Sequence, residues 1–127
     1  MKKKRPFSPS ASPKALGPYN HGVQFGDFLF TAGQIPLDPE SGSLVGDDIA
    51  DQTKQVLENL RLILESESLS LEHILKTTVF MVHLSELQQV NAVYAEYFPQ
   101  SCPARSTVQV AALPMRARIE IEAIAHY

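Results

Sequence analysis

CPARSTVQV at residues 102–110 and RIEIEAIA at residues 118–125 are the two stretches that decide the predicted fold. In the second, apolar residues alternate with polar ones, which is the period of a half-buried strand. In the first, two valines share one face, while Arg105, Thr107 and Gln109 share the other. Each stretch therefore predicts a strand with one apolar and one polar face.

The link at residues 111–117 contains a proline and is short, so we expect the two strands to form an antiparallel hairpin. A symmetric register would bring three pairs together: Thr107 with Glu120, Arg105 with Glu122, and Gln109 with Arg118. A slip by one residue would exchange the two faces. In this hairpin one polar face carries a guanidinium, a hydroxyl, an amide and two carboxylates, and it is the first candidate for a functional site.

Upstream, the pattern predicts a hairpin at residues 23–31 with a Gly26-Asp27 turn. A helix is expected to begin at Asp47 or Asp48, because either carboxylate can cap it, and to run to about residue 64 on its apolar spacing. The β-favouring run at residues 77–82 predicts a central strand buried on both faces. A second helix should follow, with Ser85 as its cap and Pro99 at its end.

Length and composition indicate one globular domain: 127 residues, 44% of them hydrophobic and 20% charged. We expect a flexible basic and Pro/Ser-rich tail at residues 1–16 and a single domain at residues 17–127. The net charge of −3 argues against nucleic acid as the main partner. The single cysteine, Cys102, fits a reducing compartment, so a cytoplasmic location is expected, and no run is apolar enough to span a bilayer.

Two helices can cover only one face of a sheet of five or six strands. The opposite face carries apolar side chains from residues 28–31 and 78–82. A monomer would expose them to water, so we expect a homo-oligomer.

Arg105 is the residue that the chemistry singles out. Its planar guanidinium suits bidentate capture of a carboxylate, or alternatively a salt bridge to Glu120 or Glu122 on the neighbouring strand. Glu120 can likewise be a pairing charge or a general base that orients water. The four histidines lack metal-ligand spacing and Cys102 lacks a CxxC partner, so no metal is expected.

Six motifs occur in order between Gly17 and Ala125: GPY at 17–19, TAGQIP at 31–36, KTTVF at 76–80, VNAVY at 90–94, PARS at 103–106 and IEIEA at 119–123. Together they closely resemble the reactive-intermediate deaminase family, the Rid or YjgF type. The resemblance implies a chorismate-mutase-like α+β fold with two helices on one face of a mixed sheet. It also implies a homotrimer with clefts between subunits.

The same resemblance implies hydrolysis of 2-imino acids, such as those released by pyridoxal-phosphate-dependent dehydratases, to 2-keto acids and ammonia without a cofactor. Carried over residue by residue, Arg105 binds the substrate carboxylate and Glu120 positions or activates water. Tyr19, Gly33, Asn91 and Thr107 line the cleft. An imine is already electrophilic, so this chemistry needs an oriented water rather than a covalent nucleophile.

Many close relatives have cysteine where this chain has Thr107. Because imine hydrolysis needs no thiol, we expect activity to be retained. Three alternatives stay open: a small-metabolite-binding regulator on the same trimer, an endoribonuclease or translation-inhibitor-like protein, and a purely structural trimeric scaffold. An intact Arg105 together with Glu120 favours the enzyme.

Overall fold

The computed structural model describes residues 2–127 and contains six strands, two α-helices and three 3-10 turns. The strands are β1 (Arg5–Phe7), β2 (Gly22–Phe25), β3 (Phe28–Thr31), β4 (Ile74–Met81), β5 (Ala104–Gln109) and β6 (Ile119–His126). The helices are α1 (Ile49–Glu65) and α2 (Leu87–Tyr97), and the short turns are η1 (Leu71–His73), η2 (Leu84–Glu86) and η3 (Pro114–Arg116).

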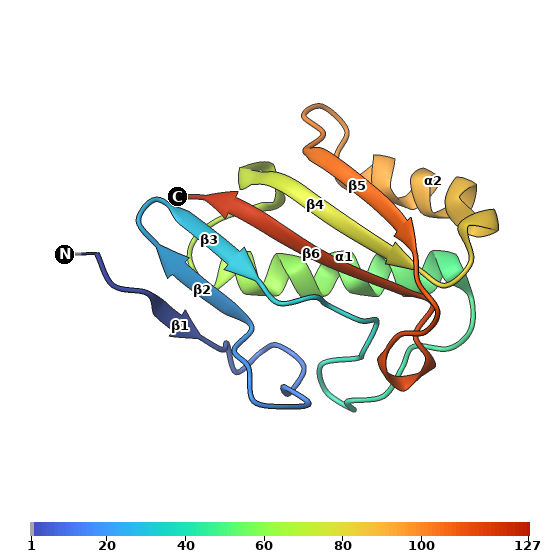
Figure 1. Ribbon diagram of the computed structural model, residues 1–127, viewed down its shortest axis with the longest axis horizontal. Helices are drawn as coiled ribbons and strands as arrows, with labels where there is room; N and C mark the ends of the chain where they lie inside the picture. Colours follow the sequence, from blue (N-terminus) through green and yellow to red (C-terminus); the bar gives the residue numbers. More distant parts are fainter. Residues whose placement is uncertain (1) are drawn as a thin grey trace.

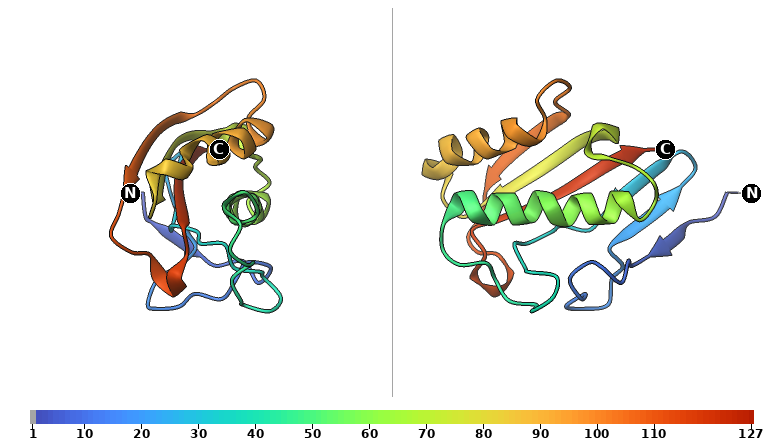
Figure 2. Two further views of the ribbon diagram at one scale, coloured as in Figure 1. Left: turned by 90° about the vertical axis from the view of Figure 1, so that its right-hand side faces the viewer. Right: turned by 180° about the vertical axis from the view of Figure 1, so that it is seen from behind.

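All six strands form one mixed sheet in the order β1-β2-β3-β6-β4-β5. Neighbouring strands are antiparallel except β4 and β5, which are parallel. Figure 1 looks onto the open face of this sheet, and Figure 2 shows α1 and α2 together on the other face. The predicted α+β architecture with two helices on one face is confirmed.

The predicted terminal hairpin is wrong, because β5 and β6 do not pair with each other. β4 lies between them and aligns Thr77 with both Arg105 and Ala123. When a helix connects two neighbouring strands of a sheet, the second strand usually lies parallel to the first. β4–α2–β5 is such a unit. The link at residues 111–117 therefore crosses two strand spacings, about 10 Å, to reach the other edge of β4.

Two local predictions in the N-terminal half are confirmed. Gly26 takes a positive φ of 60° in the β2–β3 turn, a conformation that L side chains rarely adopt. Asp48 caps α1 by accepting hydrogen bonds from the backbone N–H groups of Ala50 and Asp51, at 2.7 Å and 3.4 Å. Ser85, in contrast, lies inside η2 and makes no side-chain cap for α2.

The main core lies between the helices and the sheet and contains Leu29, Leu57, Leu60, Val79, Val90 and Ile121, among others. The inner face of β4 is fully buried there through Thr77, Val79 and Met81. Its outer face is only half-buried, so the prediction of a strand buried on both faces is wrong for an isolated subunit. The polar Thr77 is accommodated because its hydroxyl is hydrogen-bonded to Tyr94, at 2.8 Å.

The N-terminal segment, expected to be a tail, contributes a strand to the sheet. β1 pairs with β2, with Arg5 opposite Gln24. Arg5 also forms an ion pair with Glu67, beyond the end of α1, and Glu67 accepts a hydrogen bond from Tyr127 Oη at 2.6 Å. Partial burial acts to raise the pKa of Glu67, but the hydrogen bonds from Tyr127 and Arg5 outweigh it, so the pKa lies below its usual value. Residues 5–7 are thus attached to the domain.

Candidate functional site

Arg105 lies on the helix-covered side of the sheet, where α2 supports it. Its Nη1 donates a hydrogen bond of 2.8 Å to Asn91 Oδ1 on α2. Its guanidinium carbon lies 4.9 Å from the centroid of the Tyr94 ring, one helical turn further on. The register of β5 places Thr107 on the same side, two residues along. Arg105, Asn91 and Thr107 therefore form one group on the helix-covered side of the sheet.

No carboxylate within residues 2–127 forms an ion pair with Arg105. The three ion pairs found there are Arg5–Glu67, Arg61–Glu58 and Arg118–Glu86. The alternative of a salt bridge from Arg105 to Glu120 or Glu122 within one subunit is therefore wrong. Arg105 keeps a full positive charge and hydrogen-bond donors for an external carboxylate.

Glu120 lies on the opposite, open face of the sheet. It aligns with Phe80 of β4, whereas Ile119 and Ile121 on either side of it are buried against the helices. Partial burial raises the pKa of Glu120, and the neighbouring charge of Glu122 raises it further. A carboxylate of this kind is a stronger base than an exposed one and is suited to accepting a proton from water.

Gly33 makes room for the Glu120 side chain. A Cβ atom at position 33 would lie 2.7 Å from both Cδ and Oε2 of Glu120, closer than real contacts allow. The backbone is fixed there by a bridge between Gln34 and Ile121, with N···O distances of 2.8 Å and 3.1 Å. The Gly33 backbone and the Glu120 carboxylate are therefore held in contact.

Tyr19 belongs to the same end of the molecule as Gly33. Both residues line a small hollow of about 20 Å³ together with Leu16 and His21. The Tyr19 ring is exposed, and its hydroxyl accepts a hydrogen bond of 3.2 Å from the backbone N–H of Leu16. Tyr19, Gly33 and Glu120 thus form a second group.

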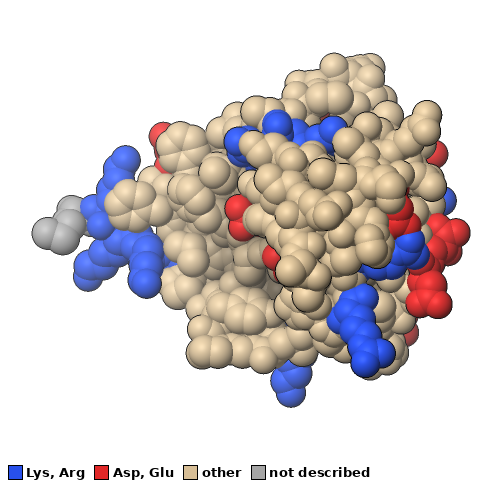
Figure 3. All heavy atoms as spheres, turned by 45° about the vertical axis from the view of Figure 1, so that its right-hand side comes forward, with Lys and Arg blue, Asp and Glu red and all other residues tan. Residues whose placement is uncertain are grey.

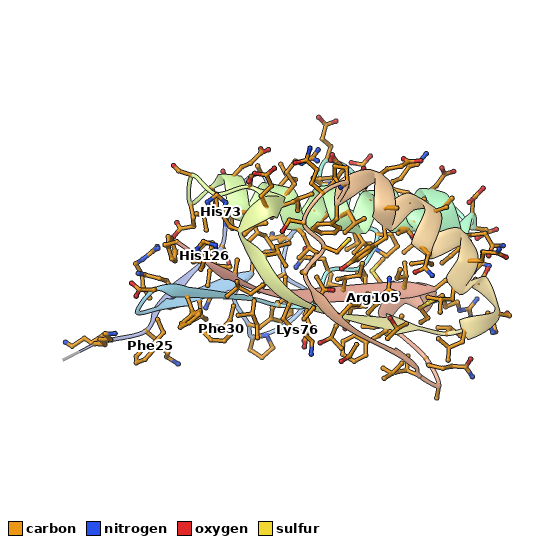
Figure 4. The ribbon with its side chains drawn as sticks, turned by 90° about the horizontal axis from the view of Figure 1, so that it is seen from above. Phe25, Phe30, His73, Lys76, Arg105 and His126 are labelled. Carbon is orange, nitrogen blue, oxygen red and sulfur yellow. The ribbon has the colours of Figure 1, made fainter. Side chains whose placement is uncertain are left out.

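The two groups do not meet within one subunit. Because Arg105 aligns with the buried Thr77 while Glu120 aligns with Phe80, the sheet separates their side chains. Figure 4 shows Arg105 on the helix side and Phe25, Phe30 and Lys76 pointing the opposite way. The predicted single polar face that joins Arg105 with Glu120 and Glu122 is wrong, and the candidate residues of one subunit fall into two separate groups, each a candidate half-site.

The open face of the sheet is largely apolar. Phe25, Phe28 and Phe30 remain 46%, 46% and 42% exposed. A shallow hollow of about 180 Å³ beside them contains Lys76 and Glu122 among its lining residues. Figure 3 shows broad uncharged surface, with basic side chains gathered at the N-terminal end of the chain. Exposed aromatic side chains in this number are typical of a surface that another molecule covers.

Tyr94 is the member of the Arg105 group that sequence reasoning missed. The sequence places Tyr94 in the VNAVY motif of a predicted helix, without a role at the site. The signal was present: Asn91 and Tyr94 are three residues apart in a helix, so both can reach the same neighbour.

The potential metal ligands lie apart from one another in the part of the chain that the structure describes. Histidine, cysteine and carboxylate side chains there form no cluster of three that could hold an ion. None of its helices combines the length and the apolar character that crossing a bilayer requires.

Fold and site together define a small α+β protein of the YjgF/Rid class, in which an arginine without an ion pair to residues 2–127 and a half-buried glutamate lie on opposite sides of the sheet. The chain belongs to the family described as Endoribonuclease L-PSP, whose family model matches residues 9–127. The resemblance to the Rid family predicted from the motifs is thereby confirmed.

Individual relatives agree with this assignment. The chain is 50% identical to a RutC family protein of Pyrococcus horikoshii over 115 residues, 91% of each chain. It is 46% identical over 117 residues to the 2-iminobutanoate/2-iminopropanoate deaminase of Salmonella typhimurium, covering 90% of this chain and 91% of that one. The crystal structure of the YjgF gene product from E. coli superposes with a TM-score of 0.91 at 42% identity, covering 96% and 98% of the two chains.

Proposed function

We propose that this protein hydrolyses reactive 2-imino acids to 2-keto acids and ammonia. Relatives that bear the name 2-iminobutanoate/2-iminopropanoate deaminase support the activity, at 46% identity for the Salmonella protein and 40% for the human one. The observation that carries the proposal is the guanidinium of Arg105, which α2 holds in place and no carboxylate of the described chain neutralises. A buried or half-buried cation without a partner favours an anionic ligand.

In the proposed reaction Arg105 binds the substrate carboxylate, and Asn91 and Thr107 line the same side. Water adds to the imine carbon while Glu120 accepts a proton from that water. That proton moves to nitrogen and gives a carbinolamine. The remaining hydroxyl proton then passes to nitrogen, the carbon–nitrogen bond breaks, and ammonia leaves as the carbonyl forms. Water is the only co-reactant, so the reaction requires no cofactor. Thr107 supplies no thiol, and none of these steps uses one.

The half-sites support an assembly in which neighbouring subunits complete each other. We propose a homotrimer of the chorismate-mutase type, in which the open face of one subunit packs against the next. Arg105, Asn91 and Thr107 of one subunit would then face Tyr19, Gly33 and Glu120 of its neighbour. The exposed aromatic side chains of β2 and β3 would be buried in the same contact.

The test generates the imine in place, with a serine or threonine dehydratase, and measures ammonia and keto-acid release with and without this protein. Wild type should accelerate release, and Arg105→Ala should not. Multi-angle light scattering on the same sample gives the mass of the assembly. No acceleration by wild type would refute the deaminase, and a monomeric mass would refute the composite site.

The main competing function is RNA cleavage, which the printed family description favours. An RNA digest with the same preparation separates the two functions, because a ribonuclease would cleave with no imine present. The net charge of −3 makes RNA cleavage the weaker proposal, because binding to the RNA phosphates normally requires a basic surface.

A non-catalytic metabolite-binding regulator would bind 2-keto acids at Arg105 yet release no ammonia. The exposed free thiol of Cys102 supports a reducing, cytoplasmic location.

A further inference from the structure

Tyr94 is a buried residue that connects Arg105 to the core. Its side chain is 6% exposed, and its ring centroid lies 4.7 Å from that of Phe98. Its hydroxyl is 2.8 Å from Thr77 Oγ1 on β4, so the outer end of the ring is also fixed. The guanidinium carbon of Arg105 lies 4.9 Å from the ring centroid, within the range of a cation–π contact.

A single hydrogen bond cannot fix the plane of a guanidinium. Nη1 of Arg105 donates to Asn91 Oδ1, and this contact sets one point about which the group can still turn. A ring beneath the guanidinium restricts that rotation, because the attraction depends on the cation lying over the π-face. Asn91 and Tyr94 together therefore define both the position and the plane of the Arg105 guanidinium.

We propose that Tyr94 is a positioning residue that holds the Arg105 guanidinium for bidentate capture of the substrate carboxylate. The role rests on the proposed function, since it concerns the same site. Tyr94 does not touch the reacting atoms and acts only through Arg105. The hydroxyl of Thr77 anchors the outer end of the ring, and the contact with Phe98 holds the ring face in place without it.

Tyr94→Leu and Tyr94→Phe separate the ring from its hydroxyl. Leucine removes the π-face, and we expect KM to rise about two- to fivefold with kcat nearly unchanged, because the carboxylate contact exists in both ground and transition states. Phenylalanine keeps the π-face, so KM should stay close to that of wild type. The Phe variant loses only its bond to Thr77, which lowers the melting temperature.

Val93→Ala is the matched control. Val93 is a buried residue next to Tyr94 on α2, and its truncation weakens helix packing without removing a contact to Arg105. It should lower the melting temperature and leave KM unchanged. An equal rise of KM in Val93→Ala and Tyr94→Leu would reduce Tyr94 to a structural residue and overturn the proposal.

A spectroscopic measurement tests positioning without any activity. In a ¹H–¹⁵N spectrum, the ring current of Tyr94 should shift the Arg105 Nε–H resonance upfield, and Arg105→Lys identifies that resonance by its loss. The shift should disappear in Tyr94→Leu and persist in Tyr94→Phe and Val93→Ala. An unshifted Arg105 resonance in wild type would refute the stacking.

Titration with 2-oxobutanoate, a stable carboxylate probe, completes the test. Its dissociation constant should rise by the same factor as KM in Tyr94→Leu. If wild type binds the probe but releases no ammonia from imines, the deaminase fails while the positioning role stands. If Tyr94→Leu binds the probe as tightly as wild type, the positioning role fails whatever the activity.

Discussion

Gly33→Ala displaces the glutamate that serves as the base in the proposed reaction, while leaving its carboxylate chemistry intact. The new Cβ would lie 2.7 Å from Cδ and Oε2 of Glu120, whereas ordinary contacts begin at 3.4 Å, so the carboxylate must move by about 0.7 Å. It can move, because it is the far end of a flexible side chain. A displacement near 1 Å of a catalytic group costs up to about 100-fold in rate, so we expect kcat to fall by about 10- to 100-fold.

The fold should tolerate this change. Gly33 needs no left-handed backbone, and replacing such a glycine lowers the entropy of the unfolded chain. Thermal melting followed by circular dichroism should therefore shift by only a few degrees. Gly17→Ala is the matched control, because its new Cβ would meet only the Tyr19 ring, at an ordinary 3.8 Å.

A double-mutant cycle decides whether Glu120 carries the effect. In a Glu120→Ala background the added methyl group has no carboxylate to displace, so Gly33→Ala should cause no further loss in the ammonia-release assay. Losses that multiply would show that Gly33 acts through something else. Full activity of Gly33→Ala would refute the argument that the position of Glu120 limits the reaction.

Three further predictions concern the charge and the assembly of the site. Arg105→Lys keeps the charge but loses the planar pair of N–H donors, so kcat/KM should fall by about 10- to 100-fold in the dehydratase-coupled assay. Near-normal hydrolysis would refute the assigned role. Burial raises the pKa of Glu120 and the charge of Glu122 raises it further, so Glu122→Gln should lower that pKa and move the acid limb of the kcat/KM–pH profile to lower pH; an unmoved limb would exclude Glu120 as the base. Phe30→Glu places a charge on the apolar open face, so light scattering should show a smaller assembly and activity should fall with it; an unchanged mass would remove this face from the interface.

The parts of the fold that local patterns specify were predictable. The 3.6-residue period and the capping carboxylate of Asp48 specify α1, and the positive φ at Gly26 matches the turn predicted between β2 and β3. The attachment of β1 was not predictable from its three residues. It combines pairing with β2 and contacts of Arg5 with Glu67 and Tyr127, which are 62 and 122 residues away in the chain.

The pairing of β5 is one of the predictions that failed, although a signal for the correct answer was present. A strand, a helix and a second strand follow one another from residue 74 to residue 109, and this order favours a parallel neighbour. The short link before β6 was the reason for predicting a hairpin instead. Alternation within a strand determines which of its residues share a face. Which residues of two different strands lie on the same side of the sheet also depends on the strand between them.

The way β5 and β6 face determines where the proposed reaction can take place. With β4 between β5 and β6, Arg105 shares the side of Thr77 and Glu120 shares the side of Phe80, so a single subunit cannot present both to one small substrate. A mixture of two inactive variants tests this directly. Arg105→Ala supplies intact Glu120 half-sites and Glu120→Ala supplies intact Arg105 half-sites, so mixed assemblies formed by co-refolding should regain part of the wild-type activity. Variants whose sites were complete within one subunit would stay inactive in every mixture, and that result would refute the composite site.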